Sequence, residues 1–108
     1  MSRRIILSPD AWADLDAAAR WYNRKETNLS RRFRAEVDKT LFRIARYPYA
    51  SLRVRDLGRR VLTNRFPYRI DFTFDASSVL VFAITHQRRE DTVWKDRIDQ
   101  FAGEASDD

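Results

Sequence analysis

The sequence predicts an α+β fold in which a helical hairpin covers one face of an antiparallel sheet. Two stretches in the first half, residues 9–24 and 29–46, carry apolar side chains at helical spacing. In the second half, aromatic and polar residues alternate with period two from Phe66 to Asp75, and residues 79–84 are all apolar. We therefore expect the order strand, helix, helix and three strands.

The first strand is predicted at Arg4–Leu7, a short apolar segment that ends before Ser8 and Pro9. Ser8 suits a helix N-cap, because its hydroxyl accepts a hydrogen bond from a backbone N–H of the first turn. Pro9 suits the first helical position, because its ring already fixes φ near the helical value. These signals place the first helix at about Pro9–Arg24.

A polar break at residues 25–28 separates the two helices, and either Thr27 or Asn28 is available to cap the second. That helix is expected to end near Arg46, since the residue before Pro48 is pushed out of helical geometry. Two amphipathic helices joined by a short link should pair antiparallel and cover one side of a sheet. The apolar stripe of the second helix comprises Leu29, Phe33, Val37, Leu41 and Ile44.

The remaining strands follow in the second half of the chain. Residues 49–58 are expected to be irregular, and a first strand lies within Arg59–Arg65. The aromatic strand at 66–74 follows, with one face in the core and one polar face outside. After a turn, residues 79–84 form a central strand that is apolar on both faces. A charged stretch then forms a short C-terminal helix or tail.

The length of 108 residues suits one domain, which we assign to residues 1–102, with a disordered acidic tail at 103–108. The chain has no cysteine, which excludes disulfides and thiolate metal sites, and we expect no metal or cofactor. The first residues lack the apolar segment of a secretory signal, and the apolar run at 79–84 is too short to span a membrane. We expect a cytoplasmic protein without membrane contact.

The net charge of +5 is unevenly distributed along the chain. Residues 31–69 carry twelve basic and three acidic groups, whereas residues 70–108 carry four basic and nine acidic groups. Eighteen of the 21 basic residues are arginine, which suits bidentate contacts to phosphate and carboxylate. The pattern indicates an anionic partner, either a nucleic acid or an acidic protein, with a solvated basic face as the alternative.

Four stretches of the chain occur in an order that carries a resemblance. They are Leu7–Ala11 with Asp14–Leu15, then Trp21–Tyr22 with Arg32–Phe33 and Glu36–Asp38, then Arg59–Leu62 leading to Phe66–Ile70, and finally Val81–Ile84 with His86–Arg89 and Trp94. They span roughly residues 5–97, and the aromatic-Pro-Tyr-Arg strand and the His-x-x-Arg close are the most specific. In these features the chain resembles the ParE/RelE superfamily of toxins, also called the plasmid stabilisation protein family.

The resemblance implies the toxin of a type II toxin–antitoxin system. Such a toxin is wrapped and neutralised by a cognate antitoxin, which would be ParD-like or RelB-like, and DNA contact is made through that antitoxin. The superfamily divides between two activities. ParE-like members poison DNA gyrase without being established nucleases, whereas RelE-like members cut mRNA in the ribosomal A site.

RNA cleavage without a metal needs a base for the 2′-hydroxyl, cations that hold the phosphate and an acid for the leaving oxygen. By resemblance to RelE-like toxins, Arg69 would contact phosphate, and Arg89 belongs to a basic pair at the end of the last strand. Trp94 falls near the position of a nuclease tyrosine, whose phenolic proton it cannot replace. His86, the one histidine, would be the general base, because histidine titrates near neutrality.

One feature opposes the nuclease hypothesis. RelE-like nucleases carry lysines on the strand where this chain has arginines at 59, 60 and 65, and arginine stays protonated. We therefore favour non-enzymatic poisoning of gyrase over metal-free mRNA cleavage. The residues predicted to bind the target or the antitoxin are Arg59, Arg60, Arg65, Arg69, Arg88, Arg89 and Trp94.

Structural alternatives stay open for these residues. His86, at a strand end, equally suits a hydrogen bond to a backbone group, and Arg69 equally suits an ion pair with Asp71 or with a carboxylate of a neighbouring strand. A third functional class is a non-toxic nucleic-acid-binding module. No helix-turn-helix, zinc or OB-fold pattern supports that class.

Overall fold

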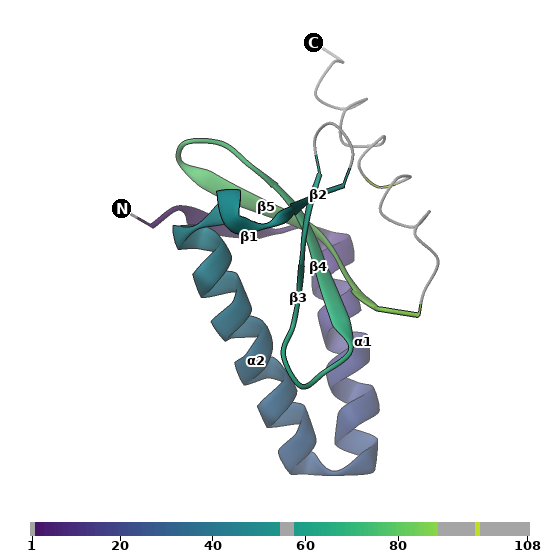
Figure 1. The fold of residues 1–108 in the computed structure, drawn as a ribbon. Helices are drawn as coiled ribbons and strands as arrows, with labels where there is room; N and C mark the ends of the chain where they lie inside the picture. The colour runs from purple at the N-terminus through teal and green to yellow at the C-terminus, as the bar shows by residue number, and fades with distance from the viewer. Residues whose placement is uncertain (1, 55–57, 89–96, 98–108) are drawn as a thin grey trace.

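The computed structural model describes residues 2–54, 58–88 and 97, and it confirms the predicted α+β class. Two helices form a hairpin that packs on one face of a five-stranded sheet (Figure 1). The elements are β1 (Arg4–Leu7), α1 (Pro9–Lys25), α2 (Thr27–Arg46), the 3-10 turn η1 (Pro48–Ala50), β2 (Leu52–Arg53), β3 (Arg59–Leu62), β4 (Tyr68–Phe74) and β5 (Ser78–His86). The predicted acidic tail at 103–108 and, apart from Arg97, the predicted C-terminal helix lie outside the described residues.

The sheet is mixed, which corrects the expectation of a purely antiparallel sheet. Its strand order is β1-β5-β4-β3-β2, and β1 runs parallel to β5 while the other neighbours are antiparallel. Strands β2 to β5 reverse direction at successive connections. By contrast, β1 precedes the helical hairpin. The hairpin returns the chain to the start of β1, where Arg3 N–H donates to the Ala45 carbonyl near the end of α2 at 3.2 Å. Turn signals in the sequence therefore do not specify the direction of β1.

The predicted helix limits agree with the structure to within two residues, but one cap is different. At α1, the Ser8 hydroxyl accepts a hydrogen bond from Ala11 N–H at 3.1 Å, and Pro9 takes the first position, as expected. At α2, the N-cap is Glu26, and its side chain makes no capping bond. Because Glu26 alone separates the helices and its N–H still bonds the Tyr22 carbonyl, Thr27 already lies inside α2.

The second half differs from the prediction in three details. A two-residue strand, β2, lies within the stretch expected to be irregular. The aromatic strand begins at Tyr68 because the preceding residues form the β3–β4 loop, in which the Thr63 hydroxyl donates to the Phe66 carbonyl at 2.6 Å. Finally, β5 extends to His86 and is longer than the predicted run at 79–84.

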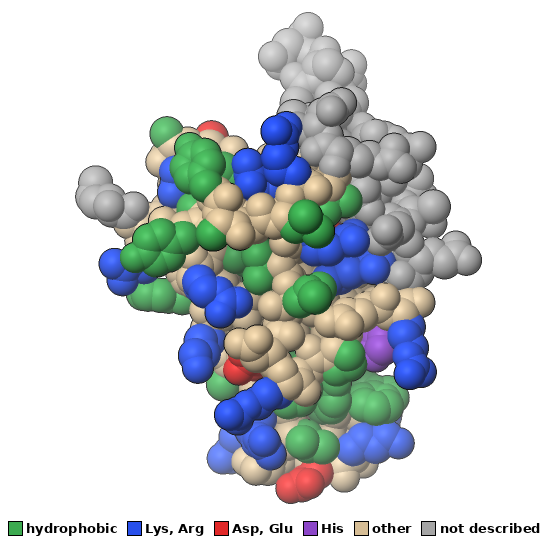
Figure 2. Space-filling model, viewed as in Figure 1, with side chains coloured by type: hydrophobic (Ala, Val, Ile, Leu, Met, Phe, Trp, Pro, Cys, Tyr) green, Lys and Arg blue, Asp and Glu red, His purple; other side chains and the backbone are tan. Residues whose placement is uncertain are grey.

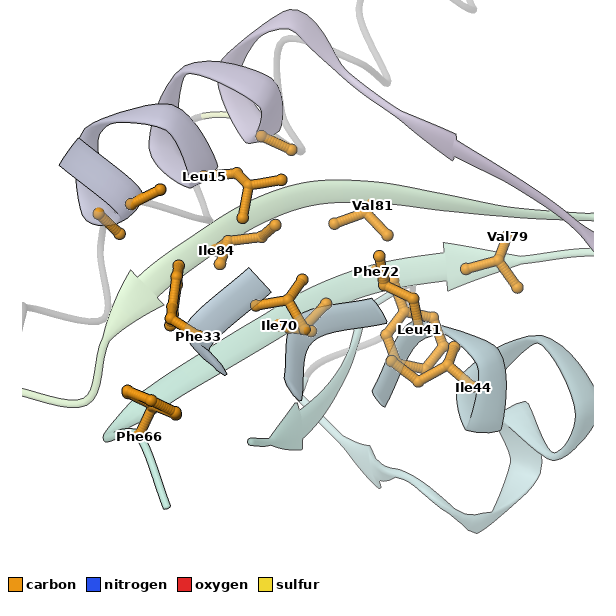
Figure 3. Close-up of a cluster of buried hydrophobic side chains, with 14 of the residues drawn as sticks. Leu15, Phe33, Leu41, Ile44, Phe66, Ile70, Phe72, Val79, Val81 and Ile84 are labelled. Carbon is orange, nitrogen blue, oxygen red and sulfur yellow. The ribbon is translucent and has the colours of Figure 1, made fainter. Parts of the chain in front are cut away.

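The hydrophobic core lies between the helical hairpin and the sheet (Figure 3). An aromatic group fills one end of it, where the Phe33 ring centroid lies 5.1 Å from that of Tyr22, 5.5 Å from that of Phe66 and 5.0 Å from that of Tyr68. Phe33 is fully buried, so its truncation to alanine should cost about 3–5 kcal/mol of stability. Tyr68, which begins the aromatic strand, is partly buried and packs against this core.

Strand β5 contains a β-bulge and is apolar on both faces. Asp71 pairs with Ala83 and Phe72 with Val81, so Phe82 is an extra residue on β5. Phe82 and Ala83 form a second buried cluster with Val54, apart from the main core. The expectation of a strand that is apolar on both faces is therefore confirmed.

Candidate functional site

Two of the predicted arginines lie together on the sheet face that points away from the helices. Arg60 of β3 stands opposite Asp71 of β4, and its Nε donates to Asp71 Oδ1 at 2.7 Å. Arg69 of β4 stands opposite Thr85 of β5, and its Nε donates to Thr85 Oγ1 at 3.1 Å. Arg69 is only 7% exposed and Asp71 only 2%. Both arginines therefore bind side chains of the neighbouring strands.

His86 lies at the end of β5 and bonds the backbone. Its Nδ1 accepts a hydrogen bond from Arg88 N–H at 3.1 Å, which requires Nδ1 to be unprotonated. The ring also packs edge-to-face on Tyr68, with centroids 5.4 Å apart at 75°. The hydrogen bond to the Arg88 backbone matches the structural alternative for a histidine at a strand end.

A groove of about 520 Å³ lies between α1 and the neighbouring ends of β4 and β5. Its rim carries Trp21, which is 47% exposed, and Lys25 Nζ lies 5.1 Å from the Trp21 ring centroid. Figure 2 shows the histidine, His86, between basic and hydrophobic side chains at this edge. Burial, followed by the neighbouring Tyr22, raises the pKa of the Tyr68 phenol above its ordinary value. The lining residues are Asp14, Ala17, Ala18, Trp21, Tyr22, Pro67, Tyr68, Ile84, Thr85 and His86.

The edge of β5 above this groove is closed by side chains. Strand β1 pairs only with the first part of β5, from Ser78 to Val81. Further along, Ile84 N–H donates to Asp14 Oδ2 at 3.0 Å, and Arg97 donates to the Phe82 carbonyl at 3.1 Å. These bonds satisfy backbone groups that would otherwise be open to pairing with another strand.

Arg97 and Asp14 hold each other in a two-pronged ion pair. One Arg97 nitrogen lies 2.6 Å from Asp14 Oδ2 and the other lies 3.2 Å from Oδ1, and the two side chains are 17% and 10% exposed. The hydrogen bond to Asp14 is the main reason why the pKa of Arg97 is raised, and burial opposes it. Sequence reasoning missed this pair, because no local spacing links residues 83 positions apart.

The other predicted site residues lie elsewhere. Arg59 stands opposite the buried Phe72 and so belongs to the helix-facing side of the sheet, unlike its neighbour Arg60. Arg65 lies in the β3–β4 loop and Arg88 in the turn after β5, two segments that are joined by a bond from Gln87 N–H to the Pro67 carbonyl. The remaining two predicted residues, Arg89 and Trp94, lie outside the described residues.

The described part of the chain contains neither a metal-binding cluster nor a membrane-spanning helix. Within residues 2–54, 58–88 and 97, no group of three or more His, Asp or Glu side chains is placed to hold a metal ion. No helix there is long and apolar enough to cross a membrane.

Comparison with known proteins identifies the family. Residues 5–91 match the family model described as the ParE toxin of the type II toxin–antitoxin system parDE. None of the curated proteins matches the chain. A solved structure described as the chromosomal ParDE toxin–antitoxin system from P. aeruginosa has the same fold, with a TM-score of 0.70 and 15% identity over 79% of this chain and 96% of that chain. The chain is a member of the ParE toxin family of type II toxin–antitoxin systems.

Proposed function

We propose that this toxin arrests growth by binding DNA gyrase and that it does not itself cleave RNA. The observation that supports this most directly is the burial of Arg69, the residue that by resemblance to RelE-like nucleases would contact phosphate. Its side chain is buried and donates to Thr85 across the sheet. A guanidinium held in this way is not presented to a phosphate outside the protein.

The other groups that a metal-free nuclease would need also argue against RNA cleavage. His86 uses Nδ1 to accept a backbone N–H, so protonating that nitrogen would break the bond. Lys25 and Lys39 lie on α1 and α2, away from the hairpin strands, where arginines stand instead. Arginine cannot shuttle protons near neutral pH, so general acid–base catalysis has little support among these residues.

The antitoxin partner that the family implies would bind in the groove beside α1. The groove is mainly apolar, its rim offers the half-exposed Trp21, and Lys25 lies over that ring. Apolar side chains of the partner would fill the groove, while acidic side chains would meet the basic end of α1. Strand addition to β5 is disfavoured there, since Asp14 and Arg97 already bind the strand edge.

The mechanism can be tested by controlled expression in bacteria. We expect growth arrest with a DNA-damage response while translation continues, and we expect the His86→Gln variant to be equally toxic. Loss of translation, cutting of ribosome-bound mRNA at the A site and loss of toxicity in His86→Gln would together overturn the proposal in favour of a RelE-like nuclease.

The antitoxin site can be tested with two tryptophans of the same helix. Co-expression of the adjacent open reading frame should relieve the arrest. Trp21→Ala should weaken binding of that gene product, whereas Trp12→Ala, which changes a similarly exposed tryptophan outside this groove, should weaken it much less. Equal losses in the two variants would exclude the groove as the binding site.

A further inference from the structure

At the end of the molecule where β1 begins, two arginines and two aromatic rings form what we call the arginine–aromatic cluster, consisting of Arg3, Tyr49, Arg59 and Phe74. We propose that this cluster binds the phosphodiester backbone of DNA. The inference goes beyond the proposed function, because it concerns direct contact with nucleic acid whatever the target enzyme is. It also differs from the expectation that DNA is contacted through the antitoxin alone.

The cluster brings two positive charges to the same pair of rings. The Tyr49 and Phe74 centroids lie 4.9 Å apart in an edge-to-face arrangement at 87°. The Arg3 guanidinium carbon lies 5.6 and 5.3 Å from these two centroids, and that of Arg59 lies 5.9 and 5.4 Å from them. Because both guanidinium groups contact the same rings, two like charges are held as neighbours.

The hydrogen bonds of these arginines leave their charge uncompensated. Arg3 Nε donates to the Asp75 backbone carbonyl at 2.7 Å, and Arg59 donates to the Ser51 carbonyl at 3.0 Å and the Tyr49 carbonyl at 3.4 Å. Within the described part of the chain, neither arginine forms an ion pair with a carboxylate. Carbonyl oxygens orient the guanidinium groups without neutralising them, and a bound anion would relieve the repulsion between the two.

The surroundings of the cluster add exposed rings and a further cation. Tyr49 is 70% exposed, and Tyr47 is 60% exposed with the Arg46 guanidinium 5.6 Å from its ring centroid. At the upper left of Figure 2, where β1 begins, basic and hydrophobic side chains alternate on the surface. Arginines that contact phosphates beside exposed aromatic rings that stack on bases are the pattern of single-stranded nucleic-acid binding.

The exposed rings favour DNA over an acidic peptide as the partner. The carboxylates of an acidic peptide would pair with the arginines but would contact little of Tyr47 and Tyr49, which have more than half of their surface exposed to water. Phosphates spaced along a strand would engage the arginines in succession, while splayed bases would cover Tyr47 and Tyr49. We therefore expect single strands to bind more tightly than duplex DNA.

The test measures binding of the full chain to a fluorescein-labelled 20-nucleotide single strand by anisotropy, from 50 to 200 mM salt. The double variant Arg3→Gln/Arg59→Gln should bind at least tenfold more weakly. It should also reduce the slope of log K against log salt by about 1.4, since each phosphate contact on a single strand contributes about 0.7. The matched control is Arg31→Gln/Arg32→Gln, which removes the same charge from an exposed part of α2 and should change affinity less than twofold.

A second variant distinguishes loss of DNA binding from a folding defect. Because the side chain of Arg46 is exposed and stacks on the exposed Tyr47 ring, Arg46→Gln should keep the melting temperature of the parent while reducing the salt slope by about 0.7. The proposal is overturned if the parent protein does not bind the strand at 50 mM salt, or if the control pair loses as much affinity as the cluster pair. It is equally overturned if a polyglutamate peptide binds through Arg3 and Arg59 and the DNA strand does not.

Discussion

Replacing Asp14 by alanine should lower the free energy of unfolding by about 3 kcal/mol. The carboxylate accepts two bonds from Arg97 and one from Ile84 N–H, so its loss leaves a guanidinium and a strand-edge amide without their partner. Breaking a fully buried pair costs about 3–5 kcal/mol. The lower end of that range applies here, because the Arg97 side chain is 17% exposed and Asp14 10%.

Urea unfolding at neutral pH measures this loss, with the slope against denaturant expected to be unchanged. Asp16→Ala is the matched control on the same helix, since its ion pair with Arg34 joins side chains that are 46% and 54% exposed. Such a surface pair contributes about 0–1 kcal/mol. If Asp14→Ala destabilises the protein no more than Asp16→Ala does, the bonds of Asp14 to Arg97 and to the edge of β5 do not stabilise the fold.

Three further predictions concern the cap, the β3–β4 loop and a buried phenol. Ser8→Ala should lower the free energy of unfolding by about 1 kcal/mol, because Ala11 N–H loses its acceptor. Thermal unfolding checks this, with Ser2→Ala as the control. An unchanged stability of Ser8→Ala would contradict the capping role of Ser8. Arg65 has a φ of 70°, in the left-handed region, so Arg65→Asn should raise stability by about 0.5–1 kcal/mol in urea unfolding, and a decrease would show that the arginine makes compensating contacts. The pKa of Tyr68 is raised in the folded state, mainly by burial, so its contribution to stability is fully present below pH 10 and is lost as the pH rises through the folded value. Burial also raises the pKa of the Tyr22 phenol, so ultraviolet absorbance should show a late ionisation that is reduced by one tyrosine, but not abolished, in Tyr68→Phe. An unchanged titration in that variant would refute the assignment.

Local signals in the sequence were sufficient to predict most of the elements. The limits of β1 and α1 follow from Ser8 and Pro9, which act through neighbouring backbone atoms. The aromatic strand follows from the two-residue period of a pleated strand, and the apolar run of β5 from burial on both faces. Each of these signals depends on residues a few positions apart.

What the sequence could not predict depends on pairing between distant segments. The direction of β1 is set where the helical hairpin returns the chain, and Asp14 meets Arg97 across 83 residues of sequence. The arginines at 59 and 60 were expected to act together, yet successive residues of a strand point to opposite faces. Arg59 therefore joins the arginine–aromatic cluster, while Arg60 binds Asp71 on the outer face.

The most direct test of the central claim is a supercoiling assay with purified toxin and purified DNA gyrase. The buried Arg69 and the backbone-bound His86 predict that the toxin inhibits supercoiling or traps cleaved DNA. They also predict that the same preparation leaves ribosome-bound mRNA intact. Unaffected gyrase together with cleavage of mRNA in the A site would contradict the account.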